Sequence, residues 1–236
     1  MKQIVAIVAV LLLAGLLWQL VPLAAPTGLG PVARHYAEWG VAENGGSNLV
    51  TSIVVNYRGF DTLGEVTVLF LSVAGAAFVL RRRSGLTALE PVPASEIVQT
   101  GARLLFAPIV LFGAYIFVHG HLTPGGGFQG GAVVASGVLL LILADRNRHL
   151  PHGFLGWLES LSGFAYVVAG LAGLWAVGSF LANRGVLPLG TWNRLLSAGI
   201  IPVIYVVIGL KVGCELAALL DVMVHAADEA GEEAHQ

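Results

Sequence analysis

The chain has 236 residues, of which 56% are hydrophobic and only 11% are charged, with a formal net charge of −2. About a quarter of the residues in a soluble domain are charged, so this composition argues against a soluble globular protein and against a disordered one. There is no basic surplus for a nucleic-acid backbone, and the single cysteine, Cys214, cannot form an internal disulfide or a cysteine cluster for zinc or iron–sulfur. We therefore expect no cofactor or metal bound by this chain and no nucleic-acid partner.

Long stretches without charged side chains predict six membrane-spanning helices, each of which needs about 20 mostly apolar residues. In chain order we expect them near 3–22, 62–81, 102–118, 127–145, 157–179 and 198–221. Residues 122–127 (LTPGGG) separate the third from the fourth, because proline and consecutive glycines end a helix. The first stretch also resembles a signal peptide, although we expect an uncleaved helix. The predicted fold class is an all-α integral membrane protein.

Basic residues near the helix ends predict that both termini face the cytoplasm. With the N-terminus inside, seven basic residues lie on the inner side and four on the outer side. The strongest single indication is the basic cluster at 81–83, which lies on the inner side.

The chain divides into two predicted parts. Residues 1–83 contain two helices and a long outer loop, residues 84–100 form a linker, residues 101–225 contain four helices, and residues 226–236 are an acidic tail. Within the loop, residues 48–57 (NLVTSIVVNY) suit either a short strand or an interfacial helix. No repeat relates the two parts, so an internally duplicated transporter is not supported.

Lys211 and Glu215 lie four residues apart in the last predicted helix and therefore share a face. A charge near the middle of a membrane helix costs about 2.5–3.5 kcal/mol on insertion scales, so such residues are rare and tend to be functional. The pattern is typical of a station on an ion path. A Lys–Glu pair that fastens two helices, or a lysine that snorkels, explains it equally in structural terms.

Glu65 lies at the start of the second predicted helix. The sequence Thr62-Leu63-Gly64-Glu65 matches a capping box, in which the glutamate bonds back to the N-cap residue. The alternative is a carboxylate just inside the outer membrane face that accepts a cation or proton. The nearby Asp61 and Arg58 are either partners of Glu65 or ordinary loop charges.

His119 and His121 flank the outer end of the third predicted helix. Two histidines at i and i+2 on a helix point to different faces, which disfavours a shared metal. We expect capping and hydrogen bonding there, with a proton-accessible imidazole as the alternative. His149 and His152, in the predicted cytoplasmic turn, are expected to be solvated.

The segment that follows is rich in glycine. It lacks the Lys-Ser/Thr of a phosphate loop and the strand that precedes a dinucleotide fingerprint. Glycines four residues apart allow close helix approach, so we expect packing against partner subunits rather than direct ion binding. The expected packing residues are Pro124, Gly125, Gly126, Gly127, Gly130 and Gly131.

Residues 119–131 (HGHLTPGGGFQGG) resemble the signature of the MnhB/MrpB family, the B-type component of the Mrp multisubunit sodium/proton antiporters. Residues 57–65 (YRGFDTLGE) resemble a motif near the C-terminal end of the large antiporter component MrpA, which also occurs as MbhE, a separate small component of membrane-bound hydrogenase. Together the resemblances imply a fusion of an MbhE-like part and an MrpB-like part (MbhF-like in hydrogenase terms), joined at the linker 84–100.

The resemblance implies a non-catalytic membrane subunit of a sodium/proton-translocating module in the plasma membrane of a prokaryote. The transported ions are expected to be Na⁺ and H⁺, with Glu65 on the ion route. The expected setting is a membrane-bound hydrogenase-like respiratory complex, with nickel and iron–sulfur centres in partner subunits. Expected partners are Mrp-like membrane proteins of the MrpA, C, D, E, F and G types. A standalone antiporter and a purely structural scaffold are the alternatives.

Overall fold

The computed structural model describes residues 2–24, 28–82, 94–148 and 150–225. They fall into two compact units, Met1–Trp39 and Gly40–Gln236. The first unit holds α1 (Lys2–Ala24) and the beginning of α2 (Pro31–Asn44). The described side chains of α1 are exposed within the unit and almost all apolar, and its stretch Ala6–Gln19 is an apolar helix. A helix that is apolar on every side suits a membrane rather than water.

The second unit begins with two short turns of helix and continues with five long helices. The short pieces are α3 (Leu49–Ser52) and the π-helix η1 (Ile53–Tyr57). The long helices are α4 (Gly59–Arg82), α5 (Glu96–Val118), α6 (Gly127–Ala144), α7 (His152–Val177) and α8 (Ile201–His225). All five are long and apolar enough to cross a membrane, and the described residues contain no strand. The expected all-α membrane fold is confirmed.

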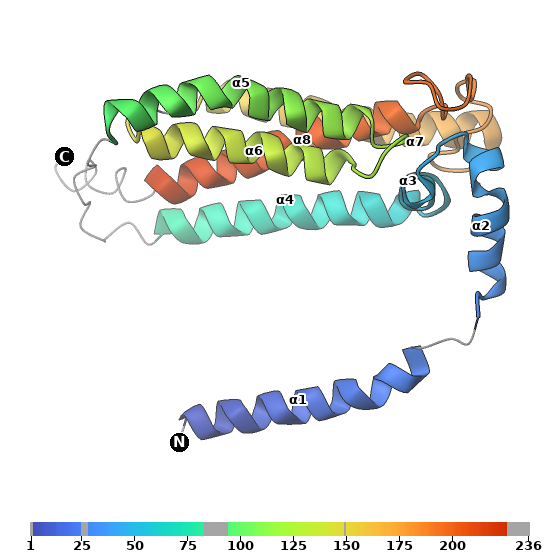
Figure 1. Cartoon of the computed structure of the whole chain (residues 1–236), viewed down its shortest axis with the longest axis horizontal. Coiled ribbons are helices and arrows are strands. Elements are labelled where there is room, and N and C mark those ends of the chain that lie inside the picture. The colour runs from blue at the N-terminus through green and yellow to red at the C-terminus, as the bar shows by residue number, and fades with distance from the viewer. Residues whose placement is uncertain (1, 25–27, 83–93, 149, 226–236) are drawn as a thin grey trace. The chain divides into compact units, whose positions relative to one another are not determined.

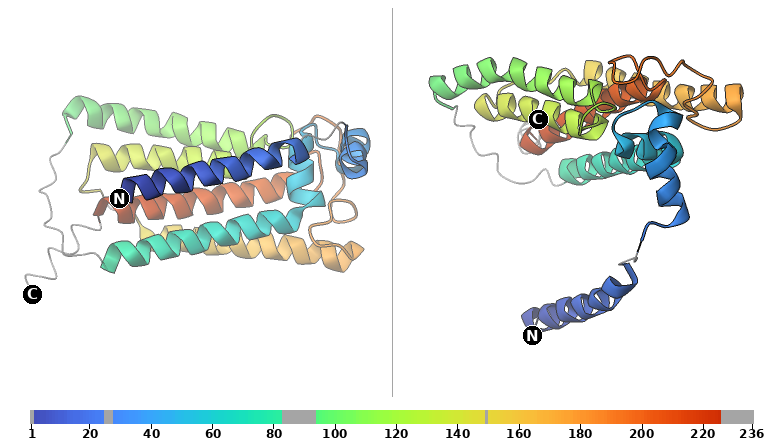
Figure 2. Two further views of the ribbon diagram at one scale, coloured as in Figure 1. Left: turned by 90° about the horizontal axis from the view of Figure 1, so that it is seen from below. Right: turned by 45° about the vertical axis from the view of Figure 1, so that its right-hand side comes forward.

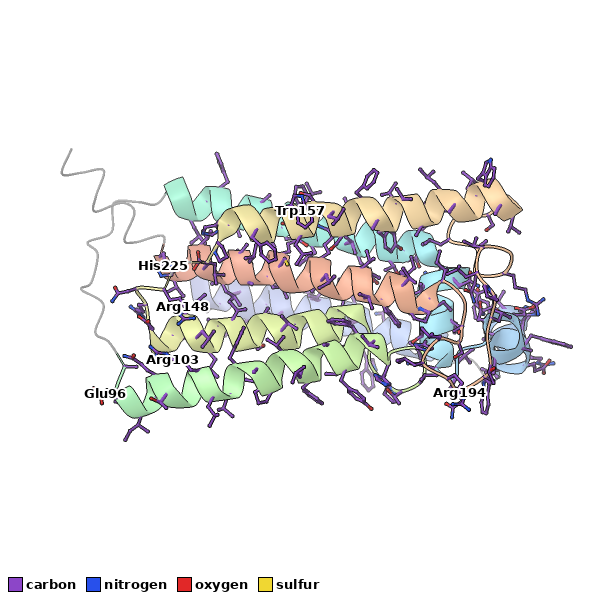
Figure 3. All side chains as sticks on the ribbon, turned by 90° about the horizontal axis from the view of Figure 1, so that it is seen from above. Glu96, Arg103, Arg148, Trp157, Arg194 and His225 are labelled. Carbon is purple, nitrogen blue, oxygen red and sulfur yellow. The ribbon has the colours of Figure 1, made fainter. Side chains whose placement is uncertain are left out.

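Helix α8 is the central element of this unit. It packs against α4, α5, α6 and α7, and Figures 1 and 2 show it running between α6 and α4. The charged groups collect at the two ends of the bundle (Figure 3), with Glu96, Arg103 and Arg148 at one end and Arg194 at the other. This distribution is typical of helices that cross a bilayer, because charged side chains avoid the hydrocarbon core.

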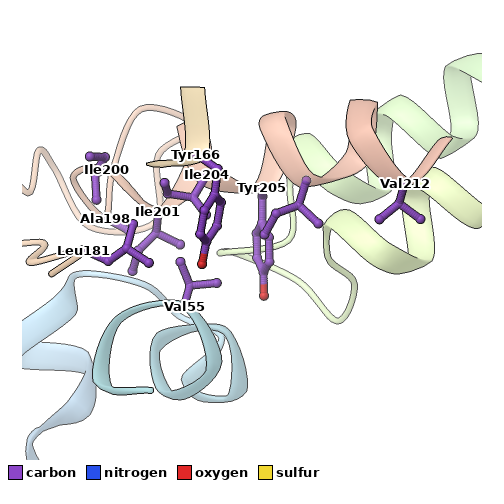
Figure 4. Packing of buried hydrophobic residues seen from close by; sticks show 10 residues of the cluster. Val55, Tyr166, Leu181, Ala198, Ile200, Ile201, Ile204, Tyr205 and Val212 are labelled. Carbon is purple, nitrogen blue, oxygen red and sulfur yellow. The ribbon is translucent and has the colours of Figure 1, made fainter. Parts of the chain in front are cut away.

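The largest buried apolar cluster lies where the beginning of α8 meets η1 and the segment that follows α7 (Figure 4). Its side chains are buried among one another and fix the position of η1 against α8. They are Val55, Tyr166, Leu181, Ala198, Ile200, Ile201, Ile204, Tyr205, Ile208 and Val212.

The glycines of the 124–131 segment pack inside this chain, so the expected packing against partner subunits is wrong for them. A Cβ added to Gly131 would lie 2.8 Å from the carbonyl oxygen of Gly209 on α8, and one on Gly130 would lie 2.5 Å from that of Gly113 on α5. A Cβ on Gly127 would lie 2.6 Å from side-chain atoms of Ile208. Helix α6 therefore uses its glycines to approach both neighbours closely.

The first residues of that segment behave differently. Gly126 would bring a Cβ within 2.7 Å of the Gln129 side chain, Gly125 has φ of 157°, and Pro124 is exposed. A side chain at Gly125 would be strained, because only glycine adopts positive φ readily.

Several predicted boundaries need correction. Helix α5 begins at Glu96, where the Ser95 hydroxyl accepts a hydrogen bond from the Val98 amide, so the last part of the predicted linker is helical. Residues 48–57 are helical rather than a strand, and α2 was not predicted. Helix α7 begins at His152, about five residues before the predicted start. Residues 83–93 of the linker and the tail 226–236 lie outside the described residues, and the orientation of the termini stays a prediction.

Candidate functional site

Three charged side chains from two helices meet inside the bundle. The Lys211 ammonium on α8 lies 3.2 Å from Oε1 of Glu159 on α7 and 3.4 Å from Oε2 of Glu215. The shared face that was predicted for Lys211 and Glu215 is confirmed by this ion pair. On the α4 side, the ammonium lies 5.3 Å from the centre of the Phe70 ring, within the range of a cation–π interaction.

This charged triad (Glu159, Lys211 and Glu215) lies at mid-membrane depth. Helix α8 has 25 residues and is therefore about 37 Å long at 1.5 Å per residue, somewhat longer than the hydrocarbon core. Lys211 is its eleventh residue and Glu215 its fifteenth. The side chains of Lys211 and Glu215 are 10% and 1% exposed. Lipid and packed helices thus replace water around the triad, which strengthens every charge interaction within it.

Glu159 was missed as a site residue by the sequence analysis. It is the one formally charged residue in α7. The predicted start at residue 157 placed it at the membrane surface, whereas the observed start at His152 places it two turns inside the helix. An isolated carboxylate in an otherwise uncharged span was the signal that pointed to it.

Glu65 faces a cavity of about 260 Å³ between α4, η1, α6 and the beginning of α8. Thr62, Gln129 and Tyr205 also line the cavity, together with the backbone around Gly127. The capping-box explanation for Glu65 is wrong, because α4 begins at Gly59 and the Thr62 hydroxyl donates to the Val54 carbonyl 2.8 Å away. The structure therefore leaves Glu65 with its cavity rather than with a cap.

Asp61 does not line this cavity. Its carboxylate pairs with the Arg58 guanidinium three residues earlier, and both side chains are largely exposed, at 48% and 63%. A surface pair of this kind contributes little to stability. Of the two options that the sequence left open, the structure shows an ordinary pair at the beginning of α4.

The cavity and the charged triad lie along the same interface between α4 and α8. Phe70 follows Glu65 by five residues on α4, a rise of about 7.5 Å, and Lys211 follows Tyr205 by six residues on α8, a rise of about 9 Å. Since Phe70 lies over Lys211 and Tyr205 lines the cavity, the two polar places are one to two helical turns apart.

A hydrogen-bonded layer closes the end of the bundle beside the cavity. The Tyr205 hydroxyl donates to Oγ1 of Thr51 at 3.0 Å, and Thr51 donates to the Gly120 carbonyl at 2.7 Å. The Asn48 amide donates to the carbonyls of Gly120 and Thr123 at 2.9 and 3.0 Å. The segment 119–123 is thereby tied to α3 and α8, in keeping with the expected hydrogen bonding at this break.

The two histidines of that segment have different surroundings. The ring of His119 lies 4.3 Å from that of Tyr115, centre to centre, and is partly exposed. The His121 side chain is fully buried, its Nε2 lies 3.4 Å from the Arg194 carbonyl, and its Nδ1 has no hydrogen-bond partner. Burial lowers the pKa of His121, and the Arg194 carbonyl partly opposes that shift. The neutral ring explains its place in an apolar layer better than a proton-accessible imidazole does.

A second ionic cluster, which the sequence did not predict, lies at the opposite end of α8. The Asp221 carboxylate lies 2.7 Å from Nε2 of His152 and 3.1 Å from Nδ1 of His225. His225 Nε2 lies 2.7 Å from the Arg146 carbonyl. The cluster thus joins the end of α8 to the beginning of α7. His152 is half-exposed but paired, so the expected free solvation is wrong for it; His149 lies outside the described residues.

No group of three or more His, Cys, Asp or Glu side chains suited to a metal ion occurs in the part of the chain that the structure describes. The polar groups that the bundle encloses are carboxylates, one ammonium, hydroxyls and imidazoles. Such groups bind and pass on protons or small monovalent cations.

The apolar spans and the enclosed charges define a multi-pass integral membrane protein with an ionic centre. Residues 97–218 match the MnhB family, a domain related to the MnhB subunit of Na⁺/H⁺ antiporter, and residues 1–97 match the MbhE family, the E component of MBH. The chain belongs to the MnhB-related family and carries an MbhE domain before it. It is a membrane subunit of an Mrp-like module in a prokaryote.

Relatives and solved structures agree with this assignment. The chain is 31% identical to an uncharacterized protein of Methanocaldococcus jannaschii, over 73% of this chain and 76% of the relative. It is 32% identical to a probable K⁺/H⁺ antiporter protein of the fused A/B type from Rhizobium meliloti, over 50% of this chain but only 14% of that protein.

Two solved complexes contain a similar chain. One is the membrane-bound sulfane sulfur reductase, an archaeal respiratory membrane complex, with a TM-score of 0.80, 43% identity, and coverage of 94% of this chain and 98% of that chain. The other is the Mrp complex of Dietzia sp. DQ12-45-1b, with a TM-score of 0.72, 27% identity, and coverage of 94% and 25%. These complexes indicate that the chain works beside other membrane subunits.

Proposed function

We propose that this subunit contributes part of the route by which Na⁺ and H⁺ cross the membrane in an Mrp-like module. The observation that carries the proposal is the charged triad at mid-membrane depth, with Lys211 between two carboxylates. Ionisable side chains at that depth are costly, and in membrane proteins they mark ion and proton pathways. The Glu65 cavity lies one to two turns away along the same helix interface and supplies a carboxylate on the predicted outer side.

The favoured setting is a respiratory complex. The chain covers 98% of the matching chain in the sulfane sulfur reductase complex, but only 25% of the matching chain in the Dietzia Mrp complex. A separate chain of this size therefore suits a complex built from split Mrp modules, as in membrane-bound hydrogenase or its sulfur-reducing relative. A standalone antiporter is the rival setting, supported by the antiporter name of the Rhizobium relative.

In this proposal, the electrons move through other subunits. Nickel or iron–sulfur centres belong to hydrogenase-like partners, and this chain binds none. Gentle purification of the tagged chain from its own membranes, with identification of its partners and analysis of nickel and iron, separates the two settings. Iron–sulfur partners support the respiratory complex, whereas proteins of the MrpA, C, D, E, F and G types without those metals support the antiporter.

The ion role is tested by Glu65→Gln in the whole complex. We expect normal assembly and lower Na⁺-coupled proton movement in membrane vesicles, because the amide keeps the shape of the side chain but carries no charge. Glu96→Gln is the matched control, since Glu96 is an exposed carboxylate in the first turn of α5. Repeating the assay with K⁺ in place of Na⁺ identifies the ion. Unchanged transport in Glu65→Gln would contradict the proposed role of Glu65.

A structural role for the triad is the second candidate, and the Lys211–Glu159 pair favours it because it joins α8 to α7. Breaking a buried ion pair leaves an uncompensated charge, so Lys211→Met would then lower the amount of assembled complex. The ion-route proposal expects lower turnover per assembled complex instead. Measuring turnover and yield in the same vesicles distinguishes the two.

A further inference from the structure

The charged triad has an unbalanced charge. It contains two carboxylates and one ammonium, and Lys211 is the one basic side chain of the described residues that pairs with either carboxylate. With all three groups ionised, the triad would hold one excess negative charge at the depth of the hydrocarbon core. An isolated buried charge is costly enough that a group neutralises instead.

The two carboxylates are not equivalent. The Glu159 side chain is 21% exposed, and its Oε1 accepts a hydrogen bond from the Lys211 ammonium at 3.2 Å. The Glu215 side chain is 1% exposed, and neither of its oxygens has a hydrogen-bond partner. Its single ionic neighbour is Nζ of Lys211 at 3.4 Å. A carboxylate without donors in an apolar site is the group whose neutral form is favoured.

We propose that the triad binds one exchangeable proton, held on Glu215 while Lys211 pairs with Glu159. The inference deepens the proposed ion route and rests on it for the path that the proton takes beyond the triad. The excess charge, the missing hydrogen bonds of Glu215 and the arrangement around Lys211 carry it together.

The same arrangement provides a transfer step between the carboxylates. The Lys211 ammonium gives one N–H proton to Glu159, and the Glu215 O–H proton passes to the Lys211 amine. One N–H and one O–H bond break, one of each forms, and Glu215 ends as the carboxylate while Glu159 carries the proton. Glu159 is the more exposed of the two, so it is the group that exchanges its proton with the surroundings.

A sodium ion suits this centre less well than a proton. Hard cations require several oxygen ligands. Lys211 occupies the space between the two carboxylates and would repel a second cation there. The proposal therefore commits to the proton, and sodium binding is an outcome that would overturn it.

Infrared difference spectroscopy on the purified whole complex in lipid tests the inference. A protonated carboxyl group gives a C=O band that shifts in heavy water and that an ionised carboxylate lacks. We expect Glu215→Gln to remove one such band at neutral pH, whereas the control Glu96→Gln leaves it unchanged. A wild-type spectrum without the band, or a band that persists in Glu215→Gln, would overturn the proposal. So would a band that disappears when Na⁺ is added at constant pH.

A second variant covers the possibility that Glu215→Gln does not assemble. Lys211→Met removes the ammonium, so the triad then holds two carboxylates without a cation and gains protonated carboxyl intensity relative to the wild type. Equal intensity in Lys211→Met would refute the charge-balance argument. This readout is separate from transport: a normal band shift with unchanged turnover in Glu65→Gln would reject the proposed ion route through Glu65 and keep the proton on Glu215.

Discussion

The glycine contact between α6 and α8 provides a prediction whose size follows from the structure. In Gly131→Ala, the new Cβ would lie 2.8 Å from the Gly209 carbonyl oxygen, 2.9 Å from the Gly213 nitrogen and 2.9 Å from the Val212 Cβ. Ordinary contacts begin at 3.4 Å, so α6 must move away by about half an ångström. Two of the three atoms belong to backbone and cannot rotate out of the way.

Overpacking of this kind costs about 1–3 kcal/mol, and the better helix propensity of alanine returns about 1 kcal/mol of that. We expect a net loss of about 1–2 kcal/mol, which lowers the melting temperature of a chain of this length by about 2–8 °C. The matched control is Gly101→Ala on α5, where an added Cβ meets no atom within 4 Å. The control gains propensity without a clash and should melt at the same or a slightly higher temperature.

Heating membrane vesicles and measuring the tagged chain that stays soluble after detergent extraction gives both melting temperatures. The partner subunits that co-purify with each variant are counted in the same samples. Equal melting of the two variants would refute the packing argument. Loss of a partner protein from Gly131→Ala without a lower melting temperature would show that the glycine face contacts another subunit after all.

Three further predictions concern the ends of the bundle. Because burial lowers the pKa of His121, the unfolded chain binds a proton at its ordinary value of 6.5 before the native chain does; melting temperature should therefore fall as the pH drops below 6.5, and His121→Gln should reduce that dependence. Thr51→Val removes two buried hydrogen bonds and should cost about 1–3 kcal/mol in the same melting assay, whereas the exposed Thr67→Val should change stability by less than about 0.5 kcal/mol; equal losses would contradict the closing layer. Asp221→Asn should destabilise the chain by about 1–3 kcal/mol, and His152→Gln by less than about 1 kcal/mol because its side chain is 55% exposed; the reverse order would show that the half-exposed pair holds the helix ends.

The positions of the predicted spans follow closely from the sequence, because apolar length alone decides whether a helix suits a bilayer. The boundaries follow less well. Ser95 caps α5 within the predicted linker, and His152 begins α7 before its apolar stretch starts. Polar residues at helix ends belong to the helix in the structure but interrupt the hydrophobic pattern in the sequence.

The candidate site could be predicted only in part. The four-residue spacing of Lys211 and Glu215 fixes their common face within one helix, since that relation depends on helix geometry alone. Glu159 joins them across 52 residues of sequence, and no local pattern encodes that approach. The role of Glu65 depended in the same way on where α4 begins, which Gly59 and the Thr62–Val54 hydrogen bond decide.

The sequence by itself determined the membrane class, the five long apolar spans and the two motifs that carry the family resemblance, because these depend on composition and on spacing within single segments. The tertiary structure alone decided that the glycines of α6 pack within this chain, that Asp221 lies between two histidines, and that one ammonium serves two carboxylates. These are contacts between helices, and contacts between distant segments are set by the packing of the whole bundle.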